Sequence, residues 1–338
     1  MREAQASAAD TSGRMRYIDY TVGWICALPK EMAAGEAMLD EIHETLPTGS
    51  NDINTYTLGR IGSHNIVMAS LPAGQYGTNN AAIVGTNMTR TFPFIQKWLL
   101  VGIGGGVPDF KDIRLGDVVV SDQVIQYDLG KCLPNGQFHR TSIPTRPAPV
   151  LMTAVSKLQA QYCRVLNSIP LLIEDMLQRH SPRMSEYRRP QTPDILFAHS
   201  YNHNSSSINA SCQECSQAQQ VRREARGSDS PAVHFGKIAS GNQVIKDGTT
   251  RQVMATELDV ICFEMEAAGL MEGLSCLVIR GICDYSDSHK NKEWQEHAAA
   301  TAAAYAKDLL LLTSISTMQA SAGEAAFRST SGQLGSPI

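Results

Sequence analysis

The sequence predicts an α/β protein whose sheet is mainly parallel and covered by helices on both faces. Short apolar runs rich in β-branched residues alternate with segments of helical character, which is the pattern of parallel strands joined by crossover helices. Several of the 26 glycines stand in tight clusters at the ends of these runs. With 338 residues, 43% of them hydrophobic, the chain can build one large core or two small ones.

The first part of the chain alternates strands and helices. Pro29 follows an apolar run and opens a helix, because its missing N–H costs nothing in the first turn. Gly62-Ser63 marks the turn of a hairpin, and Thr78 or Asn79 can cap a helix. We expect strands at 20–26, 55–61, 64–71, 98–103 and 117–125, and helices at 30–44 and from 78 or 79 to about 90.

The second part contains a polar interruption before the core resumes. Residues 179–231 show little periodicity and many Pro, Ser, Asn and Arg, so we interpret them as a long insertion or lid. We expect strands at 234–240, 261–263 and 276–283, and helices at 150–166, 247–258, 264–274 and 294–317. One domain is therefore predicted over 18–317, after a flexible leader at 1–17 and before a disordered tail at 318–338.

Composition excludes several functional classes. The chain has 29 Lys and Arg against 33 Asp and Glu, a net charge of −4, which argues against a strongly basic nucleic-acid-binding protein. No apolar run approaches the roughly 20 residues of a membrane span, and residues 1–17 lack the apolar region of a secretory signal. Most of the eight cysteines stand within apolar runs, as reduced thiols do. We expect a cytoplasmic protein with neither a nucleic-acid nor a membrane partner.

Residues with chemical potential follow four of the predicted strands. Ligands of parallel sheets bind at the carboxyl ends of strands, so these residues are candidates for one site. Two carboxyl groups in different environments can act as acid and base, and a carboxylate can accept two hydrogen bonds from a vicinal diol such as ribose. The candidates are Glu31, the glycine run 104–106 that ends the strand at 98–103, the triplet Glu264-Met265-Glu266, and the pair Asp284 and Asp287.

Five motifs occur in a characteristic order: GIGGGVP at 102–108, LGDVVVSD at 115–122, IASGNQVI at 238–245, CFEMEAAGL at 262–270 and VIRGICDYSD at 278–287. Together they resemble the purine and uridine phosphorylase superfamily, which includes the methylthioadenosine/S-adenosylhomocysteine nucleosidases. The chain looks like a fungal purine nucleosidase-type member, a group that includes domains of NLR-type and ankyrin-repeat proteins. The resemblance covers about residues 20–312. It implies a three-layer α/β/α sandwich around a twisted sheet, and cleavage of an N-glycosidic bond through an oxocarbenium-like ribosyl transition state.

The resemblance assigns roles to particular residues. Glu31 aligns with the glutamate that holds the attacking water, and Asp284 matches the acid that hydrogen-bonds purine N7 as the base departs. Glu266 and Met265 fall at the ribose positions, Glu266 holding the 2′- and 3′-hydroxyls. The base positions fall on Gly104, Gly105, Val244 and Ile245. Val244 replaces an aromatic residue usual in the nucleosidases and so removes a stacking face.

The choice between hydrolysis and phosphorolysis depends on what holds the nucleophile. Phosphorylases of this superfamily have the pattern Arg-Val-Gly-Ser, where this chain has Leu100, Val101, Gly102 and Ile103. A phosphate dianion needs cationic and hydroxyl donors, which leucine and isoleucine do not supply. Hydrolysis is therefore favoured, although a cation from the insertion or from a neighbouring subunit can replace the missing arginine.

Several of these residues also have purely structural interpretations. Glu31 suits the first turn of a helix, and Asp284 suits a helix N-cap. Asp287 is as well explained by a cap or a surface charge as by function. Arg280 stands in an apolar strand and must find a partner, which we expect to be a carboxylate in an ion pair. The glycine run is not a dinucleotide fingerprint, because Val107 occupies the last position of GxGxxG.

The insertion carries two further groups of interest. His199, His203, Cys212 and Cys215 have the residue types of a tetrahedral zinc site, but their order and spacing are unfamiliar. We favour reduced, packed cysteines or a disulfide and assign no metal. Arg222, Arg223 and Arg226 are interpreted as a solvated face, with contact to a substrate phosphate as the alternative.

The sequence-based hypothesis is thus a purine nucleosidase that releases free base and ribose from adenosine, inosine or guanosine. It needs no cofactor. One alternative is a phosphate-dependent phosphorylase, and the other is a non-catalytic nucleoside-sensing module. The intact set of carboxylates argues against the second alternative. So does the short stretch after the last predicted helix, in which we expect no room for a receptor region. The resemblance also implies a homodimer, in which Tyr127 is a candidate to reach across the interface. A monomeric mass in light scattering would contradict that expectation.

Overall fold

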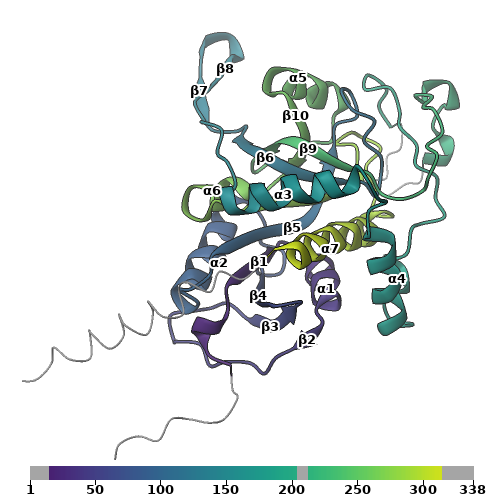
Figure 1. Cartoon of the computed structure of the whole chain (residues 1–338). Helices are drawn as coiled ribbons and strands as arrows, with labels where there is room; N and C mark the ends of the chain where they lie inside the picture. Colours follow the sequence, from purple (N-terminus) through teal and green to yellow (C-terminus); the bar gives the residue numbers. More distant parts are fainter. Residues whose placement is uncertain (1–14, 204–211, 314–338) are drawn as a thin grey trace, which may run out of the picture.

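The computed structural model describes residues 15–203 and 212–313, and it confirms the α/β fold (Figure 1). Nine strands form one sheet in the order β10-β9-β6-β11-β5-β1-β4-β3-β2, with helices packed against it. The strands of this sheet are β1 (Val22–Cys26), β2 (Glu41–Ile42), β3 (Tyr56–Ile61), β4 (His64–Ser70), β5 (Lys97–Gly106), β6 (Val118–Gln126), β9 (Val233–Ser240), β10 (Val260–Glu264) and β11 (Leu277–Asp284). A separate hairpin pairs β7 (Gly130–Cys132) with β8 (Phe138–Arg140).

Part of the sheet closes on itself. β5 pairs in parallel with β1 and β11, and β9 pairs in parallel with β6 and β10. β11 and β6 run antiparallel, and β10 returns to pair antiparallel with β5, with Phe263 opposite Gly105. The strands β5, β11, β6, β9 and β10 therefore form a ring that brings the end of β10 beside the glycines of β5.

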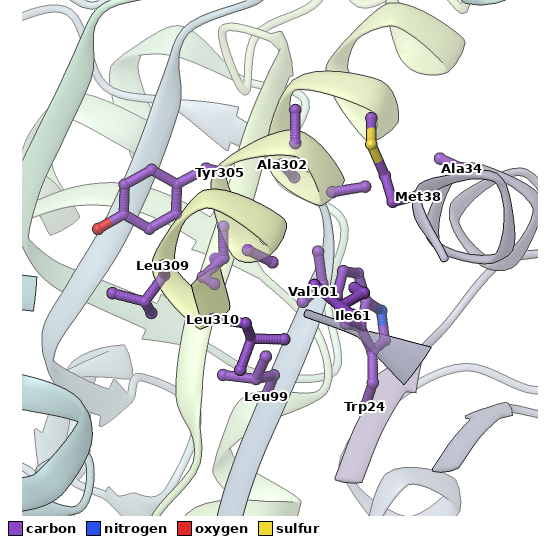
Figure 2. Packing of buried hydrophobic residues seen from close by; sticks show 14 of the residues in the cluster. Trp24, Ala34, Met38, Ile61, Leu99, Val101, Ala302, Tyr305, Leu309 and Leu310 are labelled. Carbon is purple, nitrogen blue, oxygen red and sulfur yellow. The ribbon is translucent and has the colours of Figure 1, made fainter. Parts of the chain in front are cut away.

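The alanine-rich helix α7 packs over the middle of the sheet. Figure 2 shows its Ala302, Tyr305, Leu309 and Leu310 with Leu99 and Val101 of β5, Trp24 of β1 and Met38 of α1, all of them buried. The helix approaches β11 so closely that a Cβ at Gly281 would overlap the backbone oxygen of Ala298. The helices are α1 (Pro29–Met38), α2 (Thr78–Thr91), α3 (Pro149–Tyr162), α4 (Ile169–Arg179), α5 (Gly248–Leu258), α6 (Ala267–Leu274) and α7 (Gln295–Leu312).

Several predicted boundaries are wrong, each for an identifiable reason. The glycine run lies inside β5 rather than after it, because Gly105 and Gly106 pair with β10. Helix α1 ends at Met38 instead of residue 44, since β2 follows almost at once and pairs with β3. The position before α2 is Gly77, whose φ is 105°, and no side chain of Thr78 or Asn79 caps the helix. The β7–β8 hairpin and α4 were not predicted.

The described parts of the insertion, 179–203 and 212–231, contain short 3-10 turns and one isolated bridge between Phe197 and Gln220. Residues 1–14 of the predicted leader, and residues 314–338 with the predicted tail, lie outside the described residues. Among the residues that the structure describes, no helix is both long enough and apolar enough to cross a membrane.

Candidate active site

Glu31 stands in the first turn of α1 and joins this helix to β5. One carboxylate oxygen, Oε2, accepts hydrogen bonds from the backbone N–H of Ala27 (2.7 Å) and of Leu28 (2.9 Å). The other, Oε1, accepts one from the N–H of Ile103 in β5 (2.8 Å). Burial raises the pKa of Glu31, against the lowering effect of Arg280 and of these three N–H groups. The side chain thus caps its own helix, as the structural interpretation expects, and also fixes a buried carboxylate beside β5.

The glycines of β5 leave room for acidic side chains on either side of the strand. A Cβ at Gly102 would overlap Oε1 of Glu31 and lie 2.6 Å from the Arg280 guanidinium. A Cβ at Gly105 would overlap the hydroxyl of Ser286 and lie 2.9 Å from Oδ1 of Asp284. A Cβ at Gly104 would instead lie 2.7 Å from the sulfur of Cys262. β5 therefore has Glu31 beside Gly102 and Asp284 beside Gly105, three residues further along the same strand.

Arg280 of β11 lies at the centre of three glutamates, and we call Glu31, Glu264, Glu266 and Arg280 the glutamate cluster. Its guanidinium is fully buried, is ion-paired with Glu264, and lies 3.2 Å from Oε2 of Glu266. It also donates to the backbone oxygen of Ile103 (3.4 Å). Burial by itself lowers the pKa of Arg280, but the glutamates, Glu264 most strongly, raise it overall. The predicted ion pair of Arg280 with a carboxylate is confirmed.

Glu266 occupies the position before α6, at the end of β10. Its Oε1 accepts a hydrogen bond from the N–H of Gly77 (3.3 Å), just before α2. Burial raises the pKa of Glu266 to about 7; Arg280 opposes this shift, and the charges of Glu264 and Glu31 add to it. Met265 is partly buried beside it.

Glu264 was a strand-end candidate in the sequence, but the resemblance gave it no role; the structure makes it a member of the cluster. It ends β10 and accepts hydrogen bonds from the N–H groups of Glu266 (3.1 Å) and Ala267 (3.0 Å), so it orders the start of α6. The only sequence signal for it was its place two residues before Glu266 at a strand end.

Asp284 ends β11 and is fixed by its own loop. Oδ1 accepts from the N–H of Ser286 (2.9 Å), and Oδ2 lies 2.6 Å from the ammonium of Lys290. Burial lowers the pKa of Lys290, but Asp284 more than offsets this and raises it. Lys290 had no sequence signal. Asp287 is buried, not a surface charge, and accepts from the N–H of His289 (2.9 Å).

The predicted base residues lie in the loop after β9. Val244 is 46% exposed, whereas Ile245 is buried in a cluster that also contains Phe263. Tyr127 is 2% exposed within its own chain, and its hydroxyl donates to the backbone oxygen of Gln243 (2.6 Å). The expectation that Tyr127 reaches a neighbouring subunit is therefore wrong.

The insertion's arginines are not a solvated face. Arg223 is ion-paired with Asp194 (2.9 Å), and Arg226 with buried Asp117 (2.7 Å); Arg222 alone of the three is exposed. These two pairs line a cavity of about 470 Å³, which none of the predicted site residues lines.

The cysteines and histidines of the insertion differ from the predicted set in one member. All eight cysteines are free, so Cys212 and Cys215 form no disulfide. His203 and Cys215 gather with His289, from the loop after β11, and we call these three the histidine–cysteine cluster. His199 is not part of it, because its backbone packs against the start of α5 at Gly248.

Comparisons with known proteins agree with this architecture. A sequence profile described as the phosphorylase superfamily matches residues 21–314. A nucleotide-binding leucine-rich repeat (NLR)-like protein of Hyaloscypha variabilis is 45% identical over 306 residues, which cover 88% of this chain and 30% of that protein. The ATP nucleosidase Cap17 of Escherichia coli is 26% identical over 296 residues, which cover 85% of this chain and 50% of Cap17.

Among solved structures, 5′-methylthioadenosine/S-adenosyl homocysteine nucleosidase of Helicobacter pylori superposes with a TM-score of 0.56 at 19% identity, over 86% of this chain and 98% of that one. The chain therefore matches the full length of a solved nucleosidase fold but only a third to a half of the two longer relatives.

Proposed function

The chain belongs to the phosphorylase superfamily, and from this premise we propose that it is a purine nucleosidase. It hydrolyses the N-glycosidic bond of purine ribonucleosides such as adenosine, inosine and guanosine to free base and ribose. One observation carries this proposal. A buried carboxylate, Glu31, is held by three backbone N–H groups next to a stretch of β5 that offers no side-chain donor to phosphate.

Glu31 is suited to hold and activate a water molecule. An ionised carboxylate has about four acceptor sites, and three of those on Glu31 receive backbone N–H groups. Oε1 keeps the capacity for one more donor, the nucleophilic water. The raised pKa of Glu31 makes it a stronger base than an exposed glutamate, which favours removal of a proton from that water as it attacks C1′.

The neighbourhood of Glu31 disfavours phosphate as the nucleophile. Leu100 is fully buried in the core, and Ile103 contributes its backbone N–H to Glu31. Arg280 is the nearby cation, but two glutamates already neutralise it. A phosphate dianion placed here would meet a net negative cluster, whereas a neutral water would not.

The same negative charge favours a ribosyl cation. Three carboxylates against one guanidinium stabilise positive charge that develops at C1′ in the transition state. Glu266 accepts hydrogen bonds from the 2′- and 3′-hydroxyls, with Met265 against the sugar. Asp284, oriented by Ser286 and Lys290, hydrogen-bonds N7 of the departing base. Gly104, Gly105, Val244 and Ile245 complete the base side of the site.

A product assay tests the proposal. Purified protein is given adenosine, inosine, guanosine, uridine and methylthioadenosine, each with and without phosphate, and products are separated by chromatography. We expect free purine and ribose at a rate independent of phosphate. Asp284→Asn abolishes turnover, while Asp259→Asn, at an exposed residue of another loop, retains it. Base release that requires phosphate, or full activity of Asp284→Asn, overturns the proposal.

Two relatives suggest alternatives to this function, and the same assay distinguishes them from a purine nucleosidase. Similarity to an ATP nucleosidase favours 5′-phosphorylated nucleotides as an alternative substrate class, so AMP and ATP are included. Similarity to an NLR-like protein favours a nucleoside-sensing module, which would bind these compounds without releasing base.

A cytoplasmic homodimer is part of the proposal. Exposed apolar side chains around the β7–β8 hairpin support the dimer: Leu129, Leu133 and Phe138.

A further inference from the structure

We propose that His203, Cys212, Cys215 and His289 bind one Zn²⁺ ion in a tetrahedral site that joins the insertion to the loop after β11. Three of these residues lie in the insertion, and His289 follows Asp284 by five positions. The site is separate from the glutamate cluster and shares no residue with it.

The donor atoms are already close together. One ring nitrogen of His203, one of His289 and the sulfur of Cys215 all lie within 4.8 Å of one another, and Nδ1 of His203 is 2.9 Å from Sγ of Cys215. Tetrahedral Zn²⁺, with bonds of about 2.0–2.3 Å to nitrogen and sulfur, sets its donors about 3.3–3.8 Å apart. The three donors therefore reach zinc geometry through small side-chain movements.

Cys212 supplies the fourth donor. It is separated from Cys215 by two residues, the usual spacing of a zinc-binding cysteine pair, and the N–H of Cys215 donates to the backbone oxygen of Cys212 (3.1 Å). The Sγ of Cys212 lies 3.9 Å from the backbone oxygen of His289, so the thiol faces the same cluster.

Unsatisfied nitrogens distinguish this cluster from ordinary packing. His289 is 9% exposed, yet neither of its ring nitrogens makes a hydrogen bond with the described residues, and Nε2 of His203 makes none either. A buried polar atom without a partner is unfavourable, and this cluster contains three. A bound zinc ion takes one nitrogen of each ring, and so gives His289 a partner where more protein contacts would not fit, because the His289 ring is already stacked on Phe197 with 4.1 Å between ring centres.

The surroundings of the cluster match a metal site as well. Oδ1 of Asp287 lies 3.7 Å from Nδ1 of His289, the place of the carboxylate that commonly orients a metal-binding histidine. The backbone N–H of His203 donates to the hydroxyl of Ser288 (2.9 Å), which ties the insertion to the same loop. Two thiols and two imidazoles in a tetrahedral arrangement select Zn²⁺ over the harder cations Mg²⁺ and Ca²⁺.

Zinc here would act on the position of the loop, not on the chemistry. His289 is next to Lys290, whose ammonium holds Asp284. An ion bound to His289 fixes the backbone at that point against the insertion, and so fixes the loop that carries Asp284, Ser286 and Lys290.

The test measures metal directly. Protein purified without chelators, loaded with ZnCl₂ and dialysed, is analysed by mass spectrometry for zinc per chain, and a second sample is loaded with CoCl₂ and examined by visible absorption. We expect one zinc per chain and the intense cobalt spectrum of tetrahedral thiolate coordination. The double variant Cys212→Ser with Cys215→Ser loses both signals. The matched control, Cys132→Ser with Cys163→Ser, removes two exposed cysteines and keeps both.

Three results would overturn the proposal. They are wild-type protein that retains no zinc after loading, equal zinc content in the wild type and the double variant, and a cobalt spectrum without thiolate charge transfer. The third result decides the matter from wild-type protein alone if the double variant does not fold. Because zinc content is measured without any nucleoside, its outcome is independent of the proposed nucleosidase activity.

Discussion

The glutamate cluster and the histidine–cysteine cluster both draw on β11 and the loop after it, but their polar atoms are satisfied differently. In the glutamate cluster, backbone N–H groups and Arg280 supply partners to all three carboxylates, and only Nε of Arg280 lacks a partner among the described residues. In the histidine–cysteine cluster, three ring nitrogens have no partner among the described residues. A buried carboxylate that the chain satisfies itself is positioned by folding alone, whereas several unsatisfied imidazole nitrogens in one place leave donors available to a ligand.

The source of this difference is the backbone around each cluster. The glutamates stand at strand ends and helix starts, where free N–H groups are available, as at Ala27, Leu28 and Ala267. The histidines stand in loops, where the rings of Phe197 and Tyr201 stack on His289 and present ring faces, not hydrogen-bonding groups, to it.

We expect the largest loss of stability from a substitution of Arg280. Arg280→Met removes the internal counter-ion of the glutamate cluster and leaves buried carboxylates unpaired, so we expect a loss of about 3–5 kcal/mol in the free energy of unfolding, measured with urea. Arg60→Met is the matched control, because Arg60 pairs with Glu41 at the surface and its loss costs about 0–1 kcal/mol. Equal losses in the two variants would mean that the cluster is not satisfied by Arg280.

A second prediction concerns how the free energy of unfolding depends on pH. Because the pKa of Glu266 is raised to about 7 from an ordinary 4.5, the folded protein binds more protons than the unfolded chain between these values. This contribution to stability is fully present below pH 4.5 and is lost as pH rises through 7. In Glu266→Gln, the free energy of unfolding should fall less steeply between these two pH values than it does in the wild type. Urea titrations at a series of pH values measure this slope. Glu257→Gln, at a surface pair with Arg140, keeps the wild-type fall; an unchanged fall in Glu266→Gln contradicts the prediction.

The smallest expected effect is on zinc affinity, and it tests whether Asp287 orients the His289 ring in the histidine–cysteine cluster. Asp287→Asn removes the charge behind Nδ1 of His289, so we expect the Kd for zinc, measured by competition with a chelating dye, to rise by about tenfold. Asp259→Asn leaves the Kd unchanged. An unchanged Kd in Asp287→Asn would show that Asp287 serves only its turn and the Arg251 side chain.

The sequence predicted those features that depend on residues close together in the chain. Alternating strands and helices predicted the fold. The ordered motifs placed Glu266 and Asp284 at strand ends, and Pro29 placed Glu31 in the first turn of a helix, where the structure has them. The roles of Glu264 and Lys290 depend on contacts across the sheet and within a loop, which no spacing in the sequence encodes.

The histidine set illustrates the same limit. His199 and His203 are close in sequence to Cys212 and Cys215, so proximity favoured both. The structure replaces His199 by His289, which joins the cluster only because the loop after β11 folds against the insertion. The glycine run was likewise expected after its strand instead of inside it, because its partner β10 comes far later in the chain.

The ring of strands has a consequence for how this protein is made. β1, β4 and β5 leave the ribosome early, and Glu31 is synthesised with them, but its neighbours Arg280 and Glu266 come from the last part of the ring. Contacts between such distant segments form late in folding. Arg280 reaches Glu31 only when β11 pairs with β5, and Glu264 and Glu266 join them only when β10 closes against the same strand, so the glutamate cluster is complete only in the closed ring.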